Sequence, residues 1–160
     1  MDQQELIQEY ARCLQNTNYA IESYLETYDN TQSKYVPFNL FPEQKMMLSN
    51  FEEHNDNITK KYRQAGVSTA TAAWVSKRLQ FASKNRPEKI LVIANKLDTA
   101  SEFANKVRGF LNQWPEWINV GFSKDKDSQK HFKLNNGCEV KAVATSVDAL
   151  RGYTPTTLIF

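Results

Sequence analysis

The sequence predicts an α/β fold in which strands, loops and helices alternate along the chain. Lys89 to Asn95 is a short apolar run of the kind found in buried parallel strands. Apolar residues recur at helical spacing on both sides of it, from Val75 to Ala82 and from Ala100 to Trp114. Thr157 to Phe160 has the composition of another buried strand. These observations favour a sheet with helical crossovers.

The N-terminal region is predicted to be helical. Apolar residues between Leu6 and Leu14 recur at helical spacing, which indicates an amphipathic helix from residue 2 to about residue 24. A polar loop follows at residues 29–33, and the two prolines of the aromatic stretch 35–42 exclude a regular helix there. We therefore expect an N-terminal helical segment at residues 1–34 and a second unit at residues 35–160.

The second unit is expected to open with a helix from Glu43 to about Phe51. The segment Ile58–Lys61 then leads, as a strand, into the loop Tyr62–Thr69, which opens the helix that contains Val75. This order of strand, loop and helix is typical of loops that bind phosphate.

The next helix is predicted from its ends as well as its apolar face. Thr99 and Glu102 have the spacing of a capping box, and Pro115 is expected to end the helix. Two short strands, 132–134 and 139–143, flank an Asn-Asn-Gly sequence that suits a tight hairpin turn.

The composition excludes several classes of protein. With 160 residues, 41% of them hydrophobic, the chain can bury a core, and a formal net charge of +2 gives no strong electrostatic attraction to nucleic acid. The two cysteines and two histidines lack the spacing of a zinc site. Neither a signal peptide nor an apolar run of roughly 20 residues is present, so we expect an intracellular protein with reduced thiols and no membrane contact.

The loop 61–69 departs from the standard phosphate-binding pattern G-x-x-x-x-G-K-[ST]. Gly66 and Ser68 occupy the expected places, but Lys61 stands where the first glycine belongs and Val67 where the lysine belongs. A lysine at the start of the loop can still reach the phosphates, so Lys61 is a candidate substitute. Arg63 is suited to act as an arginine finger or sensor.

A simpler interpretation of the same residues stays open. Lys60, Lys61 and Arg63 could be a solvated basic stretch, and Gly66 an ordinary turn glycine. The predicted strand before the loop and helix after it favour the nucleotide-binding interpretation.

Three motifs in order resemble one family. Leu40–Gln44, Lys61–Thr69 and Thr145–Gly152 together resemble the large terminase subunit of tailed phages, especially the myovirus type. The resemblance extends from about Asn18 to Phe160 and includes the strand at residues 90–95 and the Asn-Asn-Gly hairpin.

The resemblance implies a P-loop ATPase domain of the ASCE type, a three-layer sandwich around a mainly parallel sheet. In that family a nuclease domain follows, and the complete protein uses ATP and Mg²⁺ to pump double-stranded DNA into a procapsid. The implied partners are double-stranded DNA, the portal protein and the small terminase subunit. A homo-oligomeric ring docked on the portal in the host cytoplasm is the implied assembly.

The resemblance also implies roles for individual residues. Gln44 matches the glutamine that recognises adenine, although by itself it would be an exposed glutamine at a helix start. Ser68 matches the hydroxyl that binds magnesium, and Lys61 and Arg63 match catalytic positions. The residues implied to contact the nucleotide are Gln44, Lys61, Tyr62, Arg63, Gln64, Ala65, Gly66, Val67, Ser68 and Thr69.

The third motif precedes the family's Walker B strand, which Thr157–Phe160 resembles. Asp148, Arg151 and Gly152 lie either near the nucleotide machinery or in a simple turn that leads to that strand. The Walker B acids and the nuclease domain lie outside this sequence. We therefore expect a fragment or one part of a split gene, which binds nucleotide poorly and hardly hydrolyses it, with an exposed sheet edge that favours aggregation or pairing.

Two other functions remain possible from the sequence. One is a helicase-like P-loop ATPase, and the other is a non-enzymatic DNA-binding or assembly module that keeps the ATPase shape. The lysines of the 124–133 segment could contact DNA, but the interspersed acidic residues favour a solvated surface.

Overall fold

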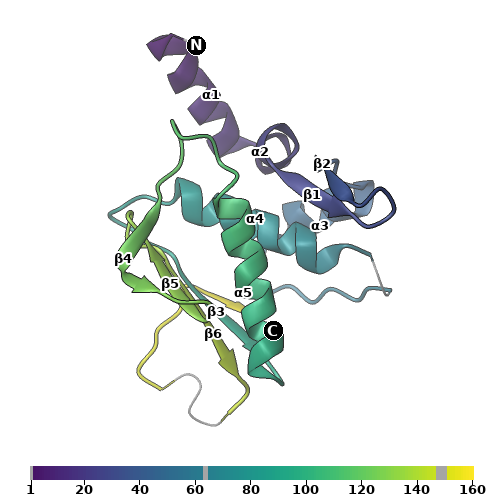
Figure 1. Ribbon diagram of the computed structural model, residues 1–160, viewed down its shortest axis with the longest axis vertical. Helices are drawn as coiled ribbons and strands as arrows, with labels where there is room; N and C mark the ends of the chain where they lie inside the picture. The colour runs from purple at the N-terminus through teal and green to yellow at the C-terminus, as the bar shows by residue number, and fades with distance from the viewer. Residues whose placement is uncertain (1, 63–64, 147–150) are drawn as a thin grey trace.

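The computed structural model describes residues 2–62, 65–146 and 151–160, which form both helices and strands (Figure 1). The helices are α1 (Gln3–Gln15), α2 (Thr17–Tyr24), α3 (Pro42–Glu53), α4 (Val67–Phe81) and α5 (Leu97–Leu111). The strands are β1 (Glu26–Asp29), β2 (Lys34–Pro37), β3 (Lys89–Ala94), β4 (Phe122–Asp127), β5 (His131–Leu134), β6 (Glu139–Ala144) and β7 (Thr157–Ile159).

The larger sheet has five strands in the order β4-β5-β6-β3-β7. The apolar strand β3 lies between β6 and β7 and runs parallel to both, as its composition predicts. The pairs β4-β5 and β5-β6 are antiparallel, so the sheet is mixed, and the prediction of a mainly parallel sheet was wrong. The physical reason is that short connections join β4 to β5 and β5 to β6, and a tight turn can join only antiparallel neighbours.

The described helices gather on one face of this sheet. Helix α5 packs on β3 and β6, and α4 packs on α5. Ile90 and Val92 of β3 belong to the same hydrophobic cluster as the buried residues of α4 and α5, whereas the alternate residues Leu91 and Ile93 lie outside that cluster. The structure thus shows a mixed α/β fold, and the described residues place no second helical layer on the other face.

The N-terminal region forms two helices and a hairpin rather than one long helix. At Asn16 the backbone is extended, and the Asn16 side chain accepts a hydrogen bond from the Tyr19 amide, which starts α2. The prediction of a single helix to residue 24 was therefore wrong at this cap. The antiparallel pair β1-β2 follows and spans residues 34 and 35, the predicted domain boundary. Residues of α1 and α2, Cys13 and Ile21 among them, share the main hydrophobic cluster.

Two further predictions along the chain were wrong in detail. The helix α5 begins after Lys96 without a side-chain cap, so Thr99 and Glu102 lie inside the helix and form no capping box. It ends at Leu111, before Pro115, and Asn112 follows as its C-cap with a backbone that is still in the helical region. The strand β4 was not predicted, since its sequence alternates charges and is exposed over most of its length. The hairpin β5-β6 was predicted, and Gly137 supplies the left-handed conformation with a φ of 89°.

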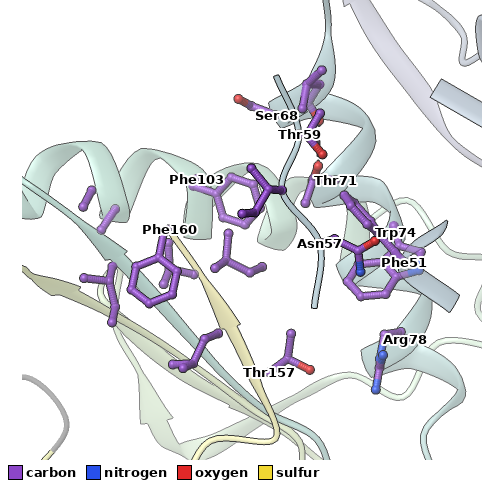
Figure 2. A pocket seen from close by; sticks show the side chains of 18 of the residues that line it. Phe51, Asn57, Thr59, Ser68, Thr71, Trp74, Arg78, Phe103, Thr157 and Phe160 are labelled. Carbon is purple, nitrogen blue, oxygen red and sulfur yellow. Dashed lines mark hydrogen bonds between the residues drawn. The ribbon is translucent and has the colours of Figure 1, made fainter. Parts of the chain in front are cut away.

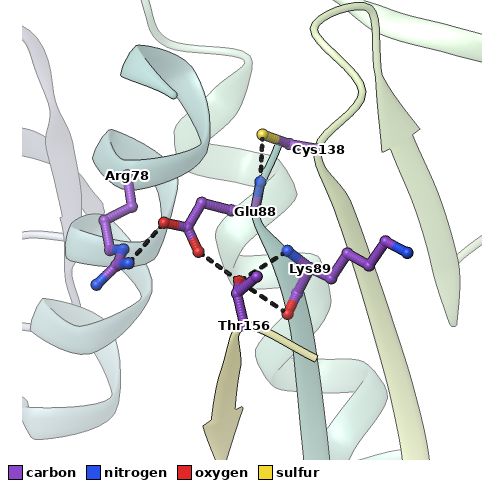
Figure 3. Close-up of polar contacts among 5 residues, drawn as sticks. All are labelled: Arg78, Glu88, Lys89, Cys138 and Thr156. Carbon is purple, nitrogen blue, oxygen red and sulfur yellow. Dashed lines mark hydrogen bonds and ion pairs between the residues drawn. The ribbon is translucent and has the colours of Figure 1, made fainter. Parts of the chain in front are cut away.

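Polar contacts fasten the beginnings of β3 and β7 to the end of α4 (Figure 3). The Glu88 carboxylate accepts a hydrogen bond from Arg78 Nη2 at 2.6 Å and another from Thr156 Oγ1 at 2.5 Å. The Thr156 hydroxyl in turn accepts from the Lys89 amide at 2.9 Å. Since α4 ends where β3 begins, the two elements run in opposite directions. The first residues of α4 therefore lie toward the carboxyl ends of β3 and β7.

Glu139 forms a buried ionic cluster at the start of β6. Its carboxylate contacts His131 Nε2 and accepts a hydrogen bond from Lys126 Nζ at 3.2 Å, while its side chain is 10% exposed. Burial raises the pKa of Glu139, but these contacts outweigh burial and hold the pKa below its ordinary value of 4.5.

We expect Glu139→Gln to lower the free energy of unfolding at pH 7 by about 1–3 kcal/mol, because it removes a buried charge-assisted contact. Because the pKa of Glu139 is lower in the folded state, its ionised carboxylate stabilises the fold above pH 4.5. This stabilisation is lost as the pH falls through the pKa of the folded state. The difference between wild type and variant should therefore shrink below about pH 4.5 in urea titrations. Glu53→Gln, at an exposed position, is the control. A pH-independent difference would contradict the assignment.

Candidate functional site

The loop predicted to bind phosphate leads directly into α4. Gly66 is the N-cap of this helix and has a left-handed backbone with a φ of 68°. The first helical amide with a described backbone acceptor is that of Ala70, which donates to the Gly66 carbonyl at 2.9 Å. No side chain caps the helix, so the amides of Val67, Ser68 and Thr69 have no acceptor among the described residues. This end of α4 is therefore able to accept an anion.

The strand predicted before the loop does not form. Ile58 to Tyr62 has no strand pairing among the described residues, and the Ile58 side chain is fully exposed. A segment needs a hydrogen-bonded neighbour to become a strand, and β7 is separated from this segment by a cleft. The prediction that the loop follows a strand was therefore wrong, whereas the prediction that it opens a helix is confirmed.

The cleft has a volume of about 1110 Å³ and runs along α4 and β7 (Figure 2). One face of α4 supplies Ser68, Thr71, Trp74 and Arg78, which follow one another along the helix. The opposite side contains Phe103 of α5 and residues 157–160. Residues 54–59 and Lys61 also line the cleft. The start of α4 thus borders the cleft at the carboxyl ends of the parallel strands, which is where ligands bind in α/β sheets.

Only part of the predicted nucleotide site borders this cleft. Lys61, Val67 and Ser68 line it, and the side chains of Lys61 and Ser68 are exposed. Lys61 makes no hydrogen bond or ion pair with any residue that the structure describes. Tyr62 is 78% exposed and Thr69 is half-buried in the first turn of α4, and neither lines the cleft.

Gln44 is buried behind the loop rather than exposed at the helix start. Its side chain is 4% exposed, and its Oε1 accepts a hydrogen bond from the Phe41 amide at 3.0 Å. Its Nε2 donates to the Ala65 carbonyl at 3.3 Å. A Cβ added at Gly66 would lie 2.6 Å from this Nε2. The structure thus places Gln44 against the loop, and Gln44 does not line the cleft.

Several predicted residues fall outside the described ranges. These are Arg63 and Gln64 in the loop and Asp148 in the third motif. Near that motif the Thr145 amide donates to the Ala94 carbonyl at 2.9 Å, which places its first residue at the end of β3. Arg151 and Gly152 lie in a turn before β7, and Gly152 has a φ of 72°.

Sequence reasoning missed the apolar and cationic lining of the cleft. Thr71, Trp74 and Arg78 were not singled out, although their spacing from Ser68 places them on one face of a helix. That spacing is the signal that could have found them. The exposed side chains of Leu158 and Phe160 agree with the expectation of an uncovered sheet edge, because β7 pairs with β3 alone among the described strands.

The lysines considered for DNA contact lie on β4, β5 and the turn between them. Lys126 pairs with Glu139 at 3.2 Å, and the neighbouring Asp127 pairs with Arg108 at 2.5 Å. Lys124 and Lys130 are exposed, and Lys133 is half-buried. This interspersed pairing favours a solvated surface over a continuous basic patch.

Comparison with protein-family models gives no match. In the described parts of the chain, no helix has the length and apolar character needed to span a membrane. Those parts also contain no group of three or more His, Cys, Asp or Glu side chains that could hold a metal ion.

Proposed function

We propose that this chain binds the phosphates of a nucleoside triphosphate at the start of α4. The observation that carries the proposal is the uncapped N-terminus of α4 at Gly66, with three backbone amides that have no described acceptor. A helix N-terminus carries a partial positive charge, and exposed amides there bind phosphate oxygens. Lys61 borders the same cleft and supplies a full positive charge. Arg63, outside the described residues, is proposed to act beside it.

The proposed wider role is that of the ATPase motor portion of a large terminase subunit. The three ordered sequence motifs support it, together with the mixed α/β fold. In this role the P-loop ATPase would drive double-stranded DNA into a procapsid as a ring on the portal protein, with the small terminase subunit as a further partner. A helicase-like ATPase would share the loop and differ in its later motifs.

A magnesium ion fits the residues at the start of α4. Ser68 offers an exposed hydroxyl in the first turn, and oxygen is the ligand that Mg²⁺ prefers. Mg²⁺ commonly takes one or two protein ligands and completes its shell with water and substrate phosphates. Such an ion would neutralise charge that develops on the phosphates. Ser68 would hold it while the amides of α4 hold the phosphates.

We expect Ser68→Ala to weaken ATP binding at least about tenfold in the presence of Mg²⁺ and to change binding little in EDTA. Mutating residues that merely support a metal ligand typically lowers metal affinity or activity by about 10- to 100-fold, so loss of a ligand itself should cost at least as much. Titration calorimetry with and without Mg²⁺ measures both values. Ser49→Ala, an exposed serine on α3, is the matched control. Equal Mg²⁺-dependent affinities for wild type and Ser68→Ala would remove Ser68 from the proposed site.

A further inference from the structure

We propose that Gln44 is a positioning residue that holds the phosphate loop in its binding conformation. The proposal rests on the proposed function, because the loop has to bind phosphate for its conformation to matter. It assigns Gln44 a role that acts through the loop backbone, in place of direct contact with a base.

The contacts of Gln44 join two elements through one amide. Oxygen Oε1 accepts from the Phe41 amide at 3.0 Å and thereby satisfies a free donor at the start of α3. Nitrogen Nε2 donates to the Ala65 carbonyl at 3.3 Å, one residue before the N-cap of α4. Both bonds need the amide in one orientation, because only the nitrogen can donate and only the oxygen can accept. The start of α3 therefore fixes the direction in which Nε2 points at the loop.

Burial makes this contact specific. Gln44 is 4% exposed, and a buried amide that loses a partner has no water to replace it. The backbone of Gly66 passes so close that a Cβ would lie 2.6 Å from Nε2. The Gln44 amide thus fills the space that a side chain at position 66 would need. Displacement of the amide would free the backbone that sets the first turn of α4.

The chemistry of the amide supplies a sharp variant. The substitution Gln44→Glu would keep an acceptor for the Phe41 amide but would set a carboxylate oxygen against the Ala65 carbonyl. The side chain keeps nearly the same size, so the packing of α3 on α4 changes little. The contact with the loop changes from attractive to repulsive.

A second buried glutamine provides a matched control. Gln80 is 3% exposed, donates from Nε2 to the Ile118 carbonyl, and accepts at Oε1 from the Val120 amide at 3.3 Å. It therefore joins α4 to a different loop with the same chemistry. Gln80→Glu should disturb residues 118–120 and leave the phosphate loop unchanged.

The test measures the loop and the ligand separately. We expect Gln44→Glu to speed hydrogen exchange about tenfold at the Ala70 amide, which donates to the Gly66 carbonyl in the unliganded chain, whereas Gln80→Glu does not. We also expect Gln44→Glu to weaken the binding of ATP and of inorganic tripolyphosphate by the same factor, since both ligands bind through the loop.

Each result has a definite meaning. Unchanged exchange at the Ala70 amide would overturn the positioning role, and so would weaker ATP binding with unchanged tripolyphosphate binding, which is the signature of a residue that reads the base. If wild type binds neither ligand, the proposed function fails, while faster exchange in Gln44→Glu would still support the contact between Gln44 and the loop.

Discussion

Gly66→Ala is expected to lower the affinity for ATP at least tenfold. The backbone of Gly66 has a φ of 68°, and a residue with a side chain costs about 1–2 kcal/mol in the left-handed region. The added Cβ would also lie 2.6 Å from Gln44 Nε2, so either the amide or the loop has to move. Both effects act on the turn that aligns the free amides at the start of α4. Equilibrium titration of ATP in the presence of Mg²⁺ measures the loss.

Two other glycines separate the causes of that loss. Gly152 has a φ of 72° and nothing within 4 Å of an added Cβ, so Gly152→Ala has the strain without the collision. Gly109 lies in α5 with open space around it, and Gly109→Ala has neither effect. We expect both variants to bind ATP within about twofold of wild type. Wild-type affinity in Gly66→Ala would contradict the assignment of this loop.

Lys61→Ala is expected to weaken ATP binding by about 10- to 100-fold, because a hydrogen bond to a charged group contributes about 1.5–3 kcal/mol. Lys61 is exposed beside the start of α4 and makes no described side-chain contact, so its loss should leave the fold intact. Thermal unfolding should therefore be unchanged. Lys60→Ala, at the neighbouring exposed lysine outside the lining of the cleft, is the control.

A second substitution tests whether Lys61 replaces the lysine of the standard pattern. Val67 stands at the standard position, is half-buried and borders the cleft. A lysine there can keep its stem against the apolar surface and extend its ammonium to the phosphates. Lys61→Ala combined with Val67→Lys should therefore restore most of the affinity. Equal binding by wild type and Lys61→Ala would show that this lysine does not hold the phosphates.

The elements that sequence predicted well have strong local signals. The strand β3 consists of a continuous apolar run, and its residues Ile90 and Leu91 are fully buried. The hairpin β5-β6 follows from the Asn-Asn-Gly sequence, whose Gly137 takes a left-handed conformation. In both places the local sequence determines the backbone conformation, and neighbouring elements have little influence on it.

The elements that sequence missed depend on partners elsewhere in the chain. Strand β4 has an exposed, charged sequence and forms because β5 offers a free edge. The segment 58–62 has the opposite problem, since no described strand lies beside it to pair with. Asn16 interrupts the N-terminal helix because its side chain caps α2, an outcome that apolar spacing does not predict.

The candidate site was predicted in the same uneven way. Spacing located Gly66 and Ser68 at the start of a helix, and the structure confirms that helix. The burial of Gln44 could not be predicted, because it depends on the packing of α3 against α4. The cleft is likewise a product of tertiary structure, since its walls come from α4, α5 and β7.

The most direct test of the account is titration of ATP into the 160-residue chain with Mg²⁺ present, followed by competition with inorganic tripolyphosphate. We predict saturable binding of one nucleotide per chain that tripolyphosphate displaces and that Gly66→Ala weakens. Absence of saturable binding at millimolar ATP, or binding that Gly66→Ala leaves unchanged, would contradict a phosphate site at the start of α4 and favour a non-enzymatic assembly module.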